Sequence, residues 1–177
     1  DAGPTDTQPP LTWIDDDVPG AMARAKKEGK LVFVDTWAEW CHTCISMKHY
    51  VLDSPALRPL GEQVIFATVD TEKEKNAAFV DKHAIDVWPT FFVLDPDKGD
   101  VLGYWPGSGS VKEMDDFVRE ALSARDARKA DKLDPKSPLA ALLAAKRAQS
   151  ESAYDEAAKH YKTAVDRAPA DWPRRTE

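Results

Sequence analysis

Both cysteines of this 177-residue chain lie in one tetrapeptide, Cys41-His42-Thr43-Cys44. The tetrapeptide follows the apolar run Leu31–Trp37, which is long enough for a buried strand, and it leads into a helical pattern. A disulfide-stapled fold would spread its cysteines along the chain, and a structural zinc site would need further cysteines or histidines at a matching spacing. The pattern therefore favours thiol chemistry at a strand-to-helix turn. The alternatives are a half-built metal site and an inert structural disulfide.

Hydrophobic spacing and helix-capping residues divide most of the chain into alternating strands and helices. The patterns predict helices at about 18–28, 44–52, 72–83 and 111–132, a short helix from residue 55, and strands at 31–37, 64–69, 90–94 and 101–105. Thr71 and Glu74 form an expected capping box for the third of these helices. The turn Asp95–Gly99 joins the last two strands as a hairpin. This order predicts an α/β domain with a mixed sheet.

Both ends of the chain differ in composition from this α/β part. Residues 1–12 are rich in Pro, Thr, Asp and Gly, and we expect them to be disordered. The segment Asp134–Pro138 breaks the pattern before two Ala-rich helical stretches, which predict an αα-hairpin. The expected organisation is a disordered segment over residues 1–12, an α/β domain over residues 13–132 and a helical hairpin over residues 137–170.

Charge and hydropathy exclude several classes of partner. The chain carries 24 Lys and Arg against 31 Asp and Glu, a net charge of −7, so we expect no binding to nucleic acid. No apolar run reaches the roughly 18 to 20 residues that a transmembrane helix needs. The sequence starts at Asp1 without an initiator Met, which is typical of an exported protein that has lost its signal peptide or of a shortened sequence. Whether a lipid anchor precedes Asp1 is open.

The positions of the two cysteines predict their roles in a redox cycle. Cys41 is expected to open a helix, where the helix dipole and unpaired N–H groups stabilise a thiolate and lower the cysteine pKa. Cys44 lies one helical turn further and within reach of a disulfide. Cys41 is thus the expected nucleophile and Cys44 the resolving thiol, with His42 and Thr43 tuning the pair. We expect no metal and no cofactor other than this redox-active disulfide.

The remaining titratable candidates are Asp35, His49 and His83. Asp35 interrupts the apolar run six residues before Cys41. Burial would raise the pKa of this carboxyl and make it a candidate proton acceptor for Cys44. A solvated carboxylate at the strand end is an equally good interpretation of the spacing. His49 and His83 fall within helical patterns, and we expect them at the surface.

A second candidate site element, Trp88-Pro89-Thr90, precedes the strand expected at 90–94. A cis peptide bond before Pro89 would turn the chain and leave the backbone of Trp88 open to pair with an extended substrate. An ordinary trans proline at a strand start is the alternative, and the residue pattern alone favours it. Trp40 and Trp88 are candidates to contact extended partners, with packing in the core as the alternative.

The segment Phe33–Cys44 strongly resembles the active-site segment of thioredoxin-like proteins, and Val87–Thr90 resembles their cis-proline loop. The resemblance covers about residues 13–124 and implies a thioredoxin fold, a central mixed sheet flanked by helices, here with a C-terminal helical hairpin. It also implies that Cys41 is the nucleophile and Cys44 the resolving thiol, that Asp35 is a buried acid, and that Pro89 is a cis proline. The subgroup resembled most is the C-terminal domain of the membrane electron carrier DsbD and its stand-alone relatives.

Several positions depart from the pattern of these families. His42-Thr43 replaces the Gly-Pro of thioredoxin, so the reduction potential of thioredoxin does not carry over. Trp88 is bulkier than the usual residue before the proline. Phe66 stands where thioredoxin has a Lys near the buried acid, and Lys48 stands where the DsbD domain has a second acid.

The helical hairpin resembles the second half of one tetratricopeptide repeat. The residues that match the spacing of that motif are Tyr154, Ala157, Tyr161, Ala164 and Pro169. A plain amphipathic hairpin fits equally well. Because a single repeat cannot bury its own apolar face, the hairpin should pack on the α/β domain, continue into further repeats, or bind a protein partner or another copy of the chain.

Together these features predict a periplasmic or otherwise exported thiol:disulfide oxidoreductase of the cell envelope that reduces protein disulfides through Cys41 and Cys44. An upstream electron donor, a membrane thiol carrier by the DsbD resemblance, would restore the dithiol. One alternative is a disulfide oxidase or isomerase, which His42 supports. The other is a non-catalytic interaction module that uses the helical tail. Substitution of Cys41 by serine separates these hypotheses, because it abolishes turnover in an enzyme and leaves partner binding by a module intact.

Overall fold

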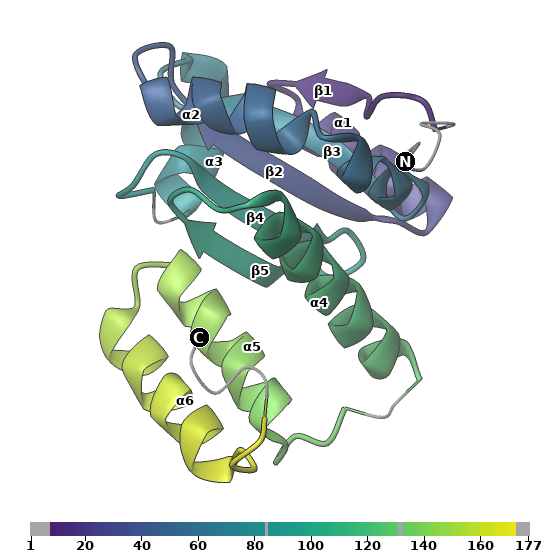
Figure 1. Cartoon of the computed structure of the whole chain (residues 1–177). Coiled ribbons are helices and arrows are strands. Elements are labelled where there is room, and N and C mark those ends of the chain that lie inside the picture. Colours follow the sequence, from purple (N-terminus) through teal and green to yellow (C-terminus); the bar gives the residue numbers. More distant parts are fainter. Residues whose placement is uncertain (1–7, 84, 131–132, 173–177) are drawn as a thin grey trace.

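The apolar runs predicted as strands pair into one mixed sheet (Figure 1). The structure is a computed structural model that describes residues 8–83, 85–130 and 133–172. Within these residues the strand order is β1-β3-β2-β4-β5, for Trp13–Asp15 (β1), Leu31–Trp37 (β2), Val64–Asp70 (β3), Thr90–Asp95 (β4) and Asp100–Pro106 (β5). The first three strands are parallel, whereas β4 runs antiparallel to both β2 and β5. The predicted fold class is confirmed.

Helices pack on both faces of the sheet (Figure 1). They are α1 (Val18–Glu28), α2 (His42–Met47), α3 (Ala77–Lys82), α4 (Val111–Lys129), α5 (Pro138–Ser150) and α6 (Tyr154–Arg167), with shorter π-helical or 3₁₀-helical turns η1 (Lys48–Leu52), η2 (Pro55–Glu62) and η3 (Glu74–Asn76). Polar caps begin several of them; the Asp17 carboxylate accepts the N–H of Gly20 at the start of α1. No helix in the described residues is long and apolar enough to cross a membrane.

The side chains of β2 alternate between two apolar clusters, one on each face of the sheet. Leu31 and Phe33 belong to the cluster that also contains buried residues of α4 and the end of α2. Val32 and Val34 belong to the cluster on the α1 side. Because side chains alternate along a strand, Asp35 projects to the same face as Leu31 and Phe33. The strand thereby directs its one acidic side chain toward the helix that carries the cysteines.

The predicted capping box at Thr71 is wrong. The Thr71 hydroxyl donates to the carbonyl of Trp37 at 3.2 Å and accepts the indole N–H of Trp88 at 3.0 Å. Contacts with residues distant in sequence thus occupy the side chain that the local pattern assigned to a cap. The helix expected at 72–83 is accordingly shorter and splits into η3 and α3. The helix expected to reach residue 132 ends at Lys129, and residues 131–132 lie outside the described residues.

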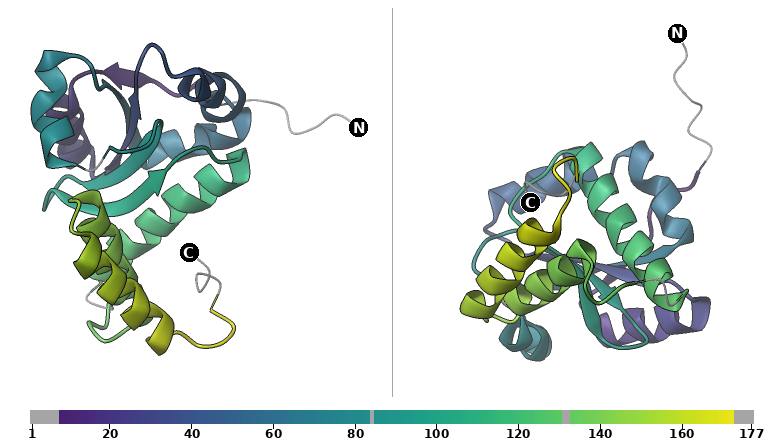
Figure 2. Two further views of the ribbon diagram at one scale, coloured as in Figure 1. Left: turned by 90° about the vertical axis from the view of Figure 1, so that its left-hand side faces the viewer. Right: turned by 90° about the horizontal axis from the view of Figure 1, so that it is seen from below.

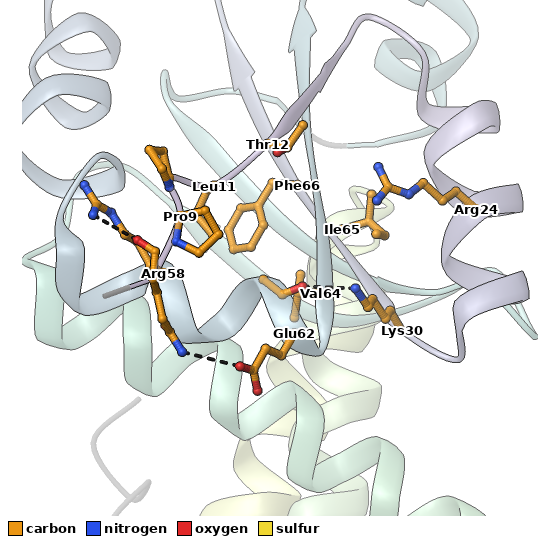
Figure 3. Close-up of a pocket in the computed structure, with 13 residues that line it drawn as sticks. Pro9, Leu11, Thr12, Arg24, Lys30, Arg58, Glu62, Val64, Ile65 and Phe66 are labelled. Atoms are coloured by element: carbon orange, nitrogen blue, oxygen red, sulfur yellow. Dashed lines mark hydrogen bonds between the residues drawn. The ribbon is translucent and has the colours of Figure 1, made fainter. Parts of the chain in front are cut away.

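Residues 8–12, the last part of the segment expected to be disordered, contact the α/β domain. Residues 1–7 lie outside the described residues, but residues 8–12 run past η2 before they enter β1 (Figure 3). The Arg58 guanidinium donates to the carbonyl of Gln8 at 3.2 Å, and Leu11 packs against the core. The sequence pattern does not predict β1, because a strand of three residues is too short to show alternation.

The C-terminal hairpin packs on the α/β domain (Figures 1 and 2). Its first helix, α5, lies against the outermost strand β5, and α6 packs on α5. Lys146 of α5 also reaches Glu120 of α4, with 3.9 Å between Nζ and Oε2. Of the three expected arrangements, the structure thus shows contact between the hairpin and the domain. Likeness to a tetratricopeptide repeat, and binding of a partner or another copy, stay predictions.

The contact between hairpin and domain includes a buried histidine, His83, which we expected at the surface. Its ring lies 4.4 Å from that of Phe79 and 5.0 Å from that of Phe92 between centroids, and its side chain lies close to the backbone of Ser150. Burial, together with the charge of Lys82, lowers the pKa of His83 from 6.5 to about 4.

This lowered pKa predicts that His83 removes stability from the fold in mild acid. The unfolded chain takes up the His83 proton at a higher pH than the folded protein, so the contribution of His83 to the free energy of unfolding should fall as the pH drops from 6.5 to about 4. The full shift corresponds to about 3 kcal/mol. In urea unfolding across this range, the stability of the wild type relative to a His83→Phe variant should fall as the pH drops, and a constant difference between the two proteins would contradict the prediction.

Candidate active site

The two cysteines form a disulfide at the carboxyl end of β2, where α2 begins. The chain turns after β2, and the Cys41 N–H donates to the carbonyl of Ala38 at 3.0 Å. Cys41 is the N-cap of α2, and its sulfur accepts the N–H of Cys44 at 3.0 Å. A Cys41 thiolate at this position would accept the same hydrogen bond and lie at the positive end of the helix dipole, which lowers the pKa of a cysteine. The placement fits the nucleophile that we predicted.

A small cavity behind the disulfide distinguishes the two sulfurs, although Cys41 and Cys44 are almost equally buried, at 5% and 4% exposure. The cavity has a volume of about 240 Å³ and is lined by Asp35, Trp37, Cys44, Ile45, Lys48, His49 and Thr68. Cys44 therefore shares a cavity with the buried acid, whereas Cys41 lies outside that lining. This arrangement suits Cys44 to give up its proton internally.

Asp35 is held in an apolar setting that changes its acidity. It is 5% exposed, and among the described residues its Oδ1 has no hydrogen-bond partner. Burial raises the pKa of Asp35 to about 7, against a smaller opposing effect of the Lys48 charge. The interpretation as a solvated carboxylate at a strand end is therefore wrong. Asp35 can take up and release a proton near neutral pH, beside Cys44.

The cation that acts on Asp35 comes from the helix side of the cavity. Phe66, which replaces the Lys of thioredoxin, packs in the core with its ring 5.2 Å from that of Phe33 between centroids. Lys48, at the start of η1, lines the cavity and favours the charged form of Asp35. Lys48 thus places a positive charge where the resemblance to the DsbD domain implies a second acid.

Trp40 and Trp88 form an aromatic wall beside the disulfide. Their ring centroids are 5.4 Å apart, and Trp88 packs against the cluster that contains both cysteines. The indole N–H of Trp40 donates to Glu72 at 2.8 Å, while that of Trp88 donates to Thr71. Trp40 is 55% exposed, so packing in the core does not account for it. The wall offers a rigid apolar surface next to the reactive sulfurs.

The Trp88–Pro89 peptide bond is cis, and Pro89 itself is buried. Thr90 is also fully buried. Its hydroxyl donates to the carbonyl of Val87 at 2.6 Å, and its N–H donates to the hydroxyl of Thr36 at 3.2 Å. Thr90, which we predicted among the substrate-binding residues, thus supports the loop from inside with its side chain. Trp88 remains at the surface of the site, partly exposed.

His42 and Thr43 lie on the exposed side of α2. Both residues line a groove of about 410 Å³, which is also lined by Tyr50 and Ser108 among others. Neither residue lines the cavity of Asp35. If they tune the redox pair as we predicted, they act on it from the solvent side.

Four residues of the site were not among those predicted to act there. Thr71 and Glu72 hold the two tryptophans, while Ile45 and Val87 are exposed apolar side chains, at 43% and 46%. A signal for the first two was present, since they directly follow β3, and the carboxyl ends of the parallel strands β2 and β3 meet at one edge of the sheet. Among the described residues, no group of three or more His, Cys, Asp or Glu is arranged to hold a metal ion.

Comparison with known proteins agrees with this geometry. The sequence model of the thioredoxin-like family matches residues 12–96, a stretch that holds both cysteines, Asp35 and Pro89. This domain is thioredoxin-like. A thioredoxin from Thermus thermophilus superposes on the thioredoxin-like domain with a TM-score of 0.61 and 25% identity, over 67% of this chain and 92% of the other.

Two further solved structures share the fold of the thioredoxin-like domain. The oxidoreductase DsbH is 18% identical with a TM-score of 0.55, over 70% of this chain and 92% of that one. The reduced C-terminal domain of DsbD from Neisseria meningitidis is 23% identical with a TM-score of 0.51, over 61% and 99% of the two chains. Protein disulfide-isomerase 1 of Dictyostelium discoideum is 27% identical over 90 residues, which make up 50% of this chain and 24% of that protein. The chain thus matches about a quarter of that curated relative.

Proposed function

We propose that this protein is a thiol:disulfide oxidoreductase that reduces disulfide bonds of protein substrates in the cell envelope. One observation carries the proposal: the Cys41–Cys44 disulfide at the start of α2 has the buried carboxyl of Asp35 in the cavity behind Cys44. Such a pair passes between dithiol and disulfide by thiol exchange alone.

The proposed cycle transfers two electrons from the protein to the substrate. The Cys41 thiolate attacks one sulfur of the substrate disulfide, and the other substrate sulfur leaves as a thiolate that takes up a proton. Cys44 then gives its proton to Asp35 and attacks the Cys41 sulfur, which releases the second substrate thiolate. The protein ends with the Cys41–Cys44 disulfide that the structure contains. An upstream dithiol donor restores the reduced pair.

The setting of Cys44 supports reduction over oxidation. A strongly oxidising pair needs a reduced form whose thiolate is greatly stabilised. Here the second cysteine shares a cavity with a carboxyl, and a negative charge on both groups at once is disfavoured. In the reduced form, the helix end therefore stabilises a thiolate at Cys41, whereas Asp35 does not stabilise a thiolate at Cys44. This balance favours a pair that gives electrons to its substrates.

The aromatic wall supports a protein substrate. Trp40, Val87 and Ile45 leave apolar surface exposed around the disulfide, and an extended chain could pair with the backbone next to the cis bond. We place the reaction in the periplasm or another exported compartment, because protein disulfides form and persist in oxidising environments. A thiol carrier that crosses the membrane is the class of donor that such a location requires.

A disulfide oxidase or isomerase is the second candidate. Two observations favour it: His42 follows the nucleophile on the exposed side of α2, where a positive charge would stabilise the Cys41 thiolate, and the curated relative is a disulfide-isomerase. Greater stability of the thiolate would raise the reduction potential and make the disulfide a better oxidant.

The reduction potential of Cys41–Cys44, measured by equilibration with glutathione beside an insulin-reduction assay, tests the proposal. We expect about −270 mV or lower, with turnover, for a reductase fed by an upstream donor. A value of about −120 to −180 mV would assign the protein to oxidation or isomerisation instead. A protein that neither forms the disulfide nor turns over would be no enzyme of this kind, and the hairpin would then be the place to look for function as an interaction module.

A further inference from the structure

The hairpin touches the thioredoxin-like domain at the segment that leads to the active site. The hydroxyl of Tyr154, the first residue of α6, donates to the carboxylate of Asp86. Near by, the side chain of His83 lies close to the backbone of Ser150, the last residue of α5. The turn between the two hairpin helices therefore contacts the connection between α3 and β4 at two points.

This connection carries one wall of the active site. Asp86 lies two residues before Trp88, whose ring packs against the cluster of both cysteines and against Trp40. Asp86 and Val87 are themselves exposed, and neither belongs to a strand or helix. From inside the domain, the connection is held by the Thr90 hydroxyl at Val87 and by packing of Ile85 against the core. At the exposed Asp86, the contact with Tyr154 adds to the order of the connection from outside.

The hairpin can act as a firm support because it is itself anchored. Its helix α5 lies against β5, and Ala141, Leu142 and Ala164 form a buried cluster between the two hairpin helices. Lys146 and Glu120 add a contact to α4. Tyr154 thus connects a packed element to an exposed one.

We propose that Tyr154 is a positioning residue. Through its hydrogen bond to Asp86, it holds the connection before Pro89 in place. Trp88 is thereby kept beside the disulfide in the position that a protein substrate contacts. The inference rests on the proposed function. Tyr154 touches neither sulfur nor the Asp35 cavity, so the reduction potential should not depend on it. What should depend on it is recognition of a large substrate, because an ordered wall loses less conformational freedom on binding than a loose one.

Three single variants test this inference. Tyr154→Phe and Asp86→Ala each remove the hydrogen bond, whereas Tyr161→Phe, the matched control, removes a hydroxyl that donates to Gln149 inside the hairpin. We expect Tyr154→Phe and Asp86→Ala to raise KM for insulin by about threefold to tenfold, the range set by one hydrogen bond, with kcat little changed. The potential against glutathione should stay that of the wild type in all three variants. Tyr161→Phe should keep the KM of the wild type.

A double variant and a measurement of local order complete the test. If the two side chains act through one bond, Tyr154→Phe with Asp86→Ala should raise KM no more than either change alone. Hydrogen exchange at Ile85–Trp88 should become faster in Tyr154→Phe and stay unchanged in Tyr161→Phe. An unchanged KM in Tyr154→Phe, additive effects in the double variant, or exchange that rises equally in the control would each overturn the inference. Failure of the wild type to reduce insulin would be recognised separately, as failure of the proposed function.

Discussion

A Cys44→Ser variant is expected to accumulate as a covalent complex with its protein substrate. The Cys41 thiolate can still attack a substrate disulfide, but the serine hydroxyl cannot displace the substrate from the mixed disulfide. Non-reducing electrophoresis and mass spectrometry should show nearly all of the reduced variant shifted by the mass of one substrate chain. Dithiothreitol should return it to the free form. Turnover should fall to the background rate.

Cys41→Ser is the matched variant, and it should behave differently. Turnover should again fall to background, but no complex should form, because Cys44 faces the internal cavity and lacks the hydrogen bond that Cys41 accepts at the helix end. If the complex formed with Cys41→Ser and not with Cys44→Ser, the two roles would be exchanged. If turnover survived in both variants, the reaction would not run through this pair.

Replacement of Asp35 by asparagine should stabilise the oxidised protein in weakly alkaline solution. The folded-state pKa of about 7 lies above the ordinary value of 3.8, so the contribution of Asp35 to the stability of the wild type is lost as the pH rises from 3.8 to about 7. The full shift is worth about 4 kcal/mol, an upper value for what Asp35→Asn can recover at pH 8. Urea unfolding should therefore show a gain of about 2 to 4 kcal/mol at pH 8 and little change at pH 4.

The same variant should be slower as an enzyme. Without a carboxylate in the cavity, Cys44 loses its proton acceptor, and release of substrate should slow by about 100-fold near neutral pH. Asp97→Asn, a change of the same kind at an exposed turn, is the control and should alter neither rate nor stability. Asp35→Asn with an unchanged rate and a flat difference in stability across this pH range would contradict the role given to the buried acid.

Features that depend on local pattern were predictable from the sequence. Leu31–Trp37 forms a strand because an unbroken apolar run suits burial on both faces of a sheet, and Asp95–Gly99 forms the turn between β4 and β5 that its composition indicates. Thr71 shows the limit of such reasoning. Its neighbours in the chain favour a helix cap. The hydroxyl is instead bound by the carbonyl of Trp37 in β2 and by the indole N–H of Trp88 in the cis-proline loop.

The site was predictable at the residues that perform chemistry and less so at those that surround it. The cysteine spacing indicated the redox pair, and Asp35 stood out as an acid in an apolar run. The pattern could not say whether that acid was buried, because a strand end can face solvent or the interior. Nor could it show that Thr90 points inward or that His83 is enclosed between aromatic rings, since these placements follow from packing across the sheet and under the hairpin.

The position of α5 against β5 has a consequence for how client proteins approach the molecule. An outermost strand offers unpaired backbone groups to any extended chain, and such pairing leads to aggregation as readily as to recognition. The proposed function brings the protein into contact with partly unfolded chains, which carry such groups along their whole length. Because α5 lies against β5, we expect that a client chain does not pair with this outermost strand, far from the sulfurs. Under the proposed function, clients engage instead beside Trp88, where pairing brings a disulfide to Cys41.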